Sequence, residues 1–71
     1  MKFSKELLKE IRLDCLIKSS QLSEVLGYET DKIKEFENGV AVPTFGEITA
    51  IAKVFGLKPK NLMVKGDKKD V

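Results

Sequence analysis

An all-α domain, folded as a compact bundle of five short helices, is the architecture that three features of the chain predict. Apolar residues recur at the three- and four-residue spacing of a helix face, candidate capping residues precede these segments, and glycines separate them. The length of 71 residues suits one domain. With 42% hydrophobic and 34% charged residues, the chain has the balance of a soluble globular protein. We expect the domain at 1–64 and a short polar tail at 65–71.

The first helix is expected within residues 1–18. Ser4 is a suitable N-cap, because its hydroxyl can accept a hydrogen bond from a free N–H of the first turn. Leu8, Ile11 and Cys15 share one helical face, so Cys15 is expected to be a small core residue. Further apolar residues widen this face, and they are expected to cover an edge of the domain or to meet a partner: Leu7, Leu13, Leu16 and Ile17.

Two shorter helices are expected next, at 19–26 and 30–37. Ser19 or Ser20 would be the N-cap of the first, and Gly27 can adopt the left-handed conformation that ends it. Two helices of about two turns joined by such a turn form a helix-turn-helix. The spacing alone fits an ordinary helical hairpin equally well.

The last two helices are predicted from capping signals. Residues 39–43 form a loop that ends in proline, and Thr44 with Glu47 has the spacing of a capping box that opens the fourth helix. Gly56 ends that helix. Pro59 suits the first position of the fifth helix.

Composition argues against several classes of function. The chain has no histidine and one cysteine, so we expect no enzyme, no metal site, no internal disulfide and no cofactor. It has no apolar run of the roughly 18 residues that a membrane-spanning helix needs, and no signal-peptide segment. We therefore expect a cytoplasmic protein that does not bind membranes.

A register of residues across most of the chain carries a family resemblance. Its members are Arg12, Leu22 with Gly27, the series Ile33, Phe36, Glu37 and Gly39, then Pro43 with Thr44, and finally Ala52, Gly56 and Leu62. From about Leu8 to Met63, this pattern resembles the phage repressor and Cro-type (lambda-repressor-like, XRE-type) helix-turn-helix family. The resemblance implies a DNA-binding domain that reads double-stranded DNA in the major groove with the 30–37 helix. It also implies that Arg12 pairs with Glu37, which ties that helix to the scaffold.

The chain departs from the family pattern at a few positions. Lys18 and Ser19 stand where the family usually has Thr and Gln, and Ser23 stands where it has Ala. The loop at 40–42 is apolar, whereas it is often basic in the family. The family glutamine often contacts DNA, and Ser19 lacks that side chain; the apolar loop at 40–42 offers no group for a phosphate.

Candidate DNA contacts follow from the resemblance and from which residues of the 30–37 helix point away from Ile33 and Phe36. On that helix they are Thr30, Asp31, Lys32, Lys34 and Glu35. Before and after it they are Ser19, Ser20, Gln21, Asn38 and Thr44. Lys32, with Thr30 and Asp31, is expected to read bases near the helix N-terminus, and Lys34 is expected to contact the DNA backbone.

Charge keeps two functional hypotheses open. Residues 19–38 hold 2 basic and 5 acidic residues, a net charge of −3, although the whole chain is +2. The first hypothesis is a repressor-like transcriptional regulator that binds DNA as a weak homodimer. The second is a protein-interaction module that keeps the fold but binds a protein partner in place of DNA. Surplus apolar residues are candidates for the dimer contact: Leu13, Val40, Val42, Met63 and Val64.

Overall fold

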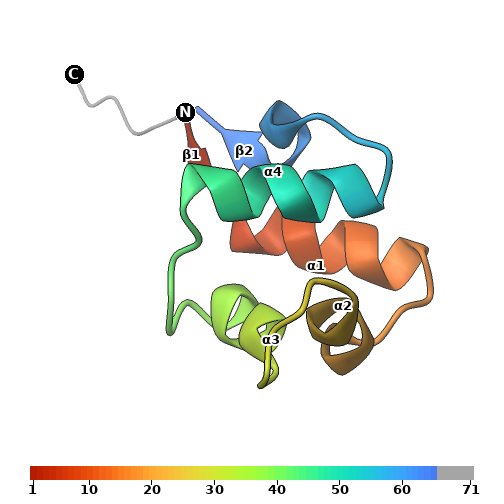
Figure 1. Cartoon of the computed structure of the whole chain (residues 1–71). Helices are drawn as coiled ribbons and strands as arrows, with labels where there is room; N and C mark the ends of the chain where they lie inside the picture. The colour runs from red at the N-terminus through yellow and green to blue at the C-terminus, as the bar shows by residue number, and fades with distance from the viewer. Residues whose placement is uncertain (66–71) are drawn as a thin grey trace.

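The computed structural model describes residues 1–65 (Figure 1). Its elements in order are β1 (Lys2–Phe3), α1 (Lys5–Asp14), α2 (Ser19–Val25), α3 (Lys32–Glu37), α4 (Phe45–Val54), the 3-10 turn η1 (Pro59–Leu62) and β2 (Met63–Val64). The predicted all-α class is confirmed. The prediction of a fifth α-helix is wrong, because the chain forms a single 3-10 turn at Pro59–Leu62. Most of the predicted tail, residues 66–71, lies outside the described residues.

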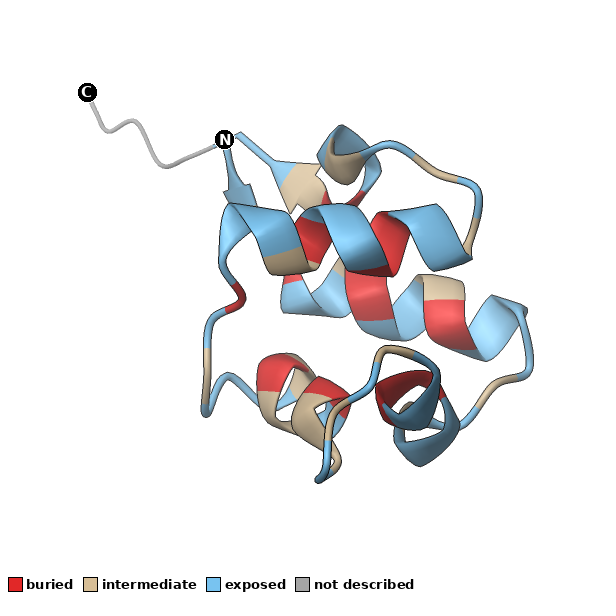
Figure 2. Ribbon diagram, in the orientation of Figure 1, coloured by how far each residue is buried: buried red, intermediate tan, exposed pale blue. Residues whose placement is uncertain are grey.

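Helices α2 and α3 pack against each other below α1, while η1 packs against α4 and α1 (Figure 1). Every helix contributes to one core, whose buried side chains are Leu8, Leu22, Ile33, Phe36, Ile48, Ile51, Ala52 and Leu62. In Figure 2, the buried stretches of the helices lie mainly on the faces that point toward the interior of the bundle. Within residues 1–65, no helix has both the length and the apolar character needed to cross a bilayer.

A small antiparallel ribbon joins the two ends of the described chain. Lys2 pairs with Val64 and Phe3 with Met63, and the Ser4 N–H donates to the Leu62 carbonyl at 2.8 Å. Each strand has only two residues, which is too short for the alternating pattern that predicts a strand from sequence.

Two of the predicted caps are confirmed. The Ser4 hydroxyl accepts from the Leu7 N–H at 3.2 Å and begins α1. Thr44 and Glu47 form a reciprocal capping box, because the Glu47 N–H donates to Thr44 Oγ1 at 3.2 Å and the Thr44 N–H donates to Glu47 Oε1 at 2.9 Å. Both helices thus begin where side chains satisfy their free N–H groups.

The predicted cap of α2 is wrong. The N-cap is Lys18, and Ser19 is already the first helical residue. The Lys18 N–H donates to the side-chain carbonyl of Gln21 at 2.9 Å. Gln21 reaches back to satisfy the N–H of the cap residue, so neither Ser19 nor Ser20 is needed as the cap.

The prediction that Cys15 is a core residue is also wrong. Helix α1 ends at Asp14, and the Cys15 thiol is exposed as the chain turns away. The inward position of the last turn belongs to Arg12, which is only 9% exposed. Leu16 then adopts a left-handed conformation with φ of 57°, and its side chain is 92% exposed.

We expect Leu16→Gly to raise the free energy of unfolding by about 1 kcal/mol. A side chain in the left-handed region clashes with its own backbone, and the glycine removes that clash at some cost in chain entropy. Almost no burial is lost, since Leu16 is 92% exposed. Urea denaturation measures the gain. Leu16→Ala is the matched control, because it removes the side chain but keeps the Cβ; equal stability of the two variants would show that strain is not the cause.

Candidate nucleic-acid interface

Helix α3 and its link to α2 form the centre of the site. Gly27 has a φ of 85° and closes α2, and the Tyr28 N–H donates to the Ser23 carbonyl at 3.0 Å. Helix α3 has only six residues, too few to be stable by itself. Its position must therefore come from the side chains that hold it.

The C-terminal end of α3 is held by Arg12 of α1. Arg12 Nε donates to Glu37 Oε2 at 2.6 Å and Nη2 donates to Oε1 at 2.9 Å, so the pair is bidentate. A third donor, Nη1, reaches the Ile17 carbonyl at 2.8 Å in the link between α1 and α2. The two side chains are 11% and 6% exposed. The hydrogen bond to Glu37 raises the pKa of Arg12, so the guanidinium stays charged.

The N-terminal end of α3 is held by Asp31, which caps the helix and accepts from α2. Ser19 Oγ donates to Asp31 Oδ2 at 2.7 Å, and Ser23 Oγ donates to Oδ1 at 2.9 Å. Oδ1 also accepts from the Lys34 N–H at 3.2 Å. Burial disfavours the charged carboxylate, but the hydrogen bonds from Ser19 and Ser23 outweigh it and lower the pKa of Asp31. Two candidate DNA contacts, Ser19 and Asp31, are thus bonded to each other.

The flank of α3 is braced by an aromatic residue that sequence analysis did not single out. Tyr28 lies in the turn before α3, and its ring meets the edge of Phe36 at 6.2 Å between centroids. Its hydroxyl donates to Glu47 Oε2 at 2.7 Å, so the turn is linked to the capping box of α4. Burial, with the hydrogen bond to Glu47, raises the pKa of Tyr28 to about 12. An aromatic residue with a polar tip in the turn is the only sequence signal of this contact.

We expect the phenol of Tyr28 to ionise near pH 12 in the folded domain, against the ordinary value of 10.0. Because the folded pKa is the higher one, stability is fully present below about pH 10 and falls as the pH rises towards 12. The chain has one tyrosine and no tryptophan, so phenolate absorbance reports this group alone. Tyr28→Phe should lose the part of the alkaline decline that Tyr28 causes. A folded-state midpoint close to that of the urea-unfolded chain would contradict the assignment.

The remaining candidates lie at different places around α2 and α3. Ser20, Gln21, Thr30, Lys34 and Asn38 are exposed. The Lys32 ammonium lies 3.5 Å from Glu35 Oε1, and this carboxylate partly neutralises the charge of the lysine. The Thr44 hydroxyl already serves the capping box at the start of α4.

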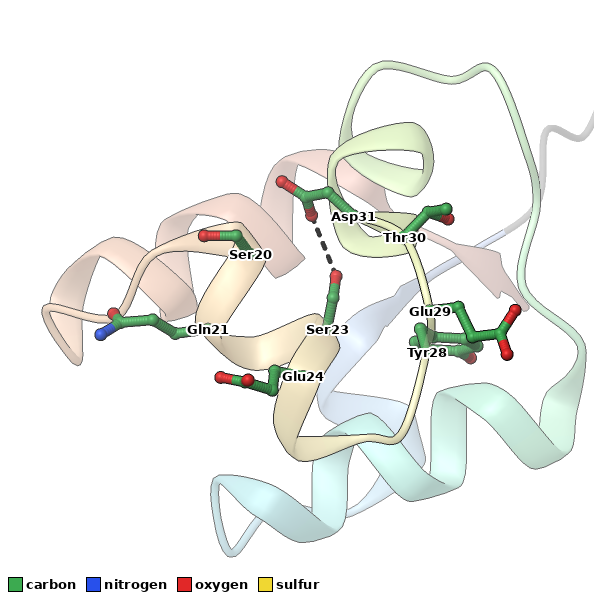
Figure 3. A pocket seen from close by; sticks show the side chains of 8 residues that line it. All are labelled: Ser20, Gln21, Ser23, Glu24, Tyr28, Glu29, Thr30 and Asp31. Atoms are coloured by element: carbon green, nitrogen blue, oxygen red, sulfur yellow. Dashed lines mark hydrogen bonds between the residues drawn. The ribbon is translucent and has the colours of Figure 1, made fainter.

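A groove of about 320 Å³ lies between α2 and the turn at residues 28–31 that leads into α3 (Figure 3). Three exposed candidates, Ser20, Gln21 and Thr30, line it together with Asp31. Lys34 and Asn38 do not line the groove, so the structure does not gather all the candidate contacts in one hollow.

Comparison with known families agrees with this geometry. Residues 7–65 match the family described as the Cro/C1-type HTH DNA-binding domain. The chain belongs to this family. No curated protein and no solved structure matches the chain. The family resemblance and the general class of DNA-binding protein are therefore confirmed.

The groove side of this Cro/C1-type domain is acidic. Glu24 and Glu29 line the groove beside Asp31, although sequence analysis named neither of them as a site residue. Their sequence signal was the net charge of −3 over residues 19–38. Negative charge at this surface repels DNA phosphates, so it lowers the electrostatic attraction between the groove and DNA.

Proposed function

We propose that the domain is a repressor-like transcriptional regulator that reads operator DNA by placing α3 in the major groove. The observation that carries the proposal is that α3 is fixed at both ends, by Arg12 to Glu37 and by Ser19 to Asp31, while Lys34 stays exposed. A reading helix discriminates between bases only if its side chains are held in register with them. We also propose a cytoplasmic location for the protein, because a DNA-binding regulator must be able to reach the chromosome.

Base readout is proposed for Thr30 and Lys32 at the start of the reading helix. To reach a base edge, the Lys32 ammonium would leave its ion pair with Glu35. Backbone contact is proposed for Lys34 and Asn38. Ser20, Gln21 and Thr44 are proposed as further polar contacts to phosphates. Glu35 is proposed to reject bases that place an acceptor opposite it.

We further propose a weak homodimer, formed through an apolar groove of about 370 Å³. Val42 and Val64 line this groove with Phe3 and Phe36, and Val42 is 78% exposed. The groove reaches the C-terminal end of α3, and a second copy there would give the two-fold symmetry that paired half-sites need. Of the five candidate dimer residues, Leu13, Val40 and Met63 do not line it.

The dimer predicts concentration-dependent sedimentation that Val42→Lys abolishes. Val42 is largely exposed, so the lysine should not disturb folding, but its charge would be trapped in the interface. Phe45→Lys is the matched control, because Phe45 is exposed but does not line the groove. A domain that stays monomeric at high micromolar concentration, both free and in the presence of a duplex that it binds, would contradict the dimer.

A protein-interaction module is the second candidate function. It is favoured by the acidic groove with Glu24 and Glu29 and by the exposed apolar loop at Val40 and Val42. Such a module would bind duplex DNA only weakly and with no preference among sequences.

One experiment separates the two. The domain is used to select duplexes from a random-sequence library, and the binding of the selected and a scrambled duplex is then titrated at several salt concentrations. A regulator yields an enriched site whose affinity falls steeply with salt. Failure to enrich any site, with weak binding to every duplex, would overturn the proposal in favour of the interaction module.

A further inference from the structure

The carboxylate of Asp31 has two structural roles. First, it caps α3, where Oδ1 accepts from the Lys34 N–H at 3.2 Å. Second, it accepts hydrogen bonds from Ser19 and Ser23, which lie one turn apart on the same face of α2. A cap requires one acceptor atom and no contact with α2, so the second role is separate from the first.

The serine bonds are strong for side-chain contacts. The Ser19 bond is 2.7 Å long and ends on a charged oxygen, which makes it charge-assisted. Ser23 is only 2% exposed, and its hydroxyl accepts from the Ile33 N–H at 3.0 Å while donating to Asp31. The first turn of α3 is therefore joined to α2 by side chains and not only by the backbone of the turn.

The two ends of α3 are thus fastened to different helices. Arg12 of α1 holds Glu37 at the C-terminal end, and the serines of α2 hold Asp31 at the other. A six-residue helix that is fastened at one end can still tilt or rotate about that end. Fastening at both ends removes this freedom.

We infer that Ser19, Ser23 and Asp31 form a clamp that sets the orientation of α3 on α2 and so determines which base pairs α3 reads. The DNA part of this inference rests on the proposed function. Asp31 and Ser19 are then positioning residues, and their loss should alter discrimination between sequences more than the affinity for DNA in general. The exposed residues of α3, such as Lys34, would make the contacts that the clamp aligns.

The test uses variants that separate the clamp from the cap. Asp31→Ser keeps an oxygen for the Lys34 N–H but cannot hold both serines, and Ser19→Ala removes one donor without changing charge. Ser19→Thr restores the hydroxyl. Asn61→Ala is the control, because it removes a capping bond to Lys58 in η1, away from α2 and α3.

The first readout needs no DNA. Residual dipolar couplings of the backbone N–H groups measure the angle between α2 and α3 in solution. The clamp predicts that this angle shifts in Asp31→Ser and in Ser19→Ala, but not in Ser19→Thr or Asn61→Ala. An unchanged angle in both clamp variants would overturn the inference, whatever the protein binds.

The second readout uses the duplex selected from the random library and its scrambled counterpart. Asp31→Ser and Ser19→Ala should each lower the ratio of the two affinities about tenfold, the effect of misplacing one base contact. Affinity for the scrambled duplex should not fall. The two changes should also be non-additive when combined, because they break the same clamp, whereas loss of two independent DNA contacts would be additive and would overturn the inference. If no duplex is enriched, the proposed function fails, and the dipolar couplings alone still decide on the clamp.

Discussion

Arg12→Ala will lower the free energy of unfolding by about 3–5 kcal/mol. The Glu37 side chain is 6% exposed, and its two oxygens accept from Arg12 at 2.6 and 2.9 Å. Without the guanidinium, a nearly buried carboxylate has no compensating charge, and the Ile17 carbonyl loses its donor as well. A domain of 71 residues is typically stable by about 4–10 kcal/mol, so this loss is a large fraction of the total free energy of unfolding.

Urea denaturation with circular dichroism measures the loss. The double variant with Arg12→Ala and Glu37→Ala should lose less stability than the two single variants do in sum, because it leaves no unpaired charge. Lys32→Ala is the surface control: its partner Glu35 is 41% exposed, and breaking that pair should cost less than about 1 kcal/mol. A urea denaturation curve of Arg12→Ala that overlays the wild-type curve would show that the pair does not hold α3.

Lys32→Ala will cost about 1–3 kcal/mol of binding free energy on the selected duplex and relax its sequence preference. Lys34→Ala will weaken binding to all duplexes alike and reduce the slope of affinity against salt by about one. The two lysines point about 200° apart around α3, so both cannot face the bases directly. Lys32 lies in the first turn, which reaches base edges in this kind of motif, but it must first release Glu35.

Both variants are measured on selected and scrambled duplexes at two salt concentrations. Glu35→Gln is informative beside them, since it frees Lys32 and removes a negative charge. Equal weakening of both duplexes by Lys32→Ala would reverse the assigned roles. No change from either lysine variant would mean that α3 does not read DNA.

Helices with long apolar faces and side-chain caps could be predicted from the sequence. Ser4 and Thr44 mark the starts of α1 and α4, because the cap depends on residues within three positions of each other. The errors fall where local patterns are ambiguous. The apolar stripe through Cys15 continued past the true end of α1, and nothing local shows that Leu16 would accept a left-handed conformation.

The candidate site could be predicted only in part, because its bonds join residues that are distant in sequence. The pairing of Arg12 with Glu37, 25 positions apart, was implied by the family resemblance and not by spacing. The bonds from Ser19 and Ser23 to Asp31 depend on how α2 packs against α3. Sequence analysis therefore assigned Ser19 and Asp31 to DNA by their chemistry, which is the same chemistry that bonds them to each other.

The anchoring of α3 also divides its surface into fixed and replaceable positions. Ile33, Phe36 and Glu37 face the scaffold, and Asp31 is bonded to it. Lys34 and Asn38 are exposed. These outward positions could be randomised together with Thr30 without touching the core or either anchor. Under the proposed function, the domain is therefore a suitable small host for new DNA specificities, because the outward residues can be exchanged while the core and both anchors of α3 stay unchanged.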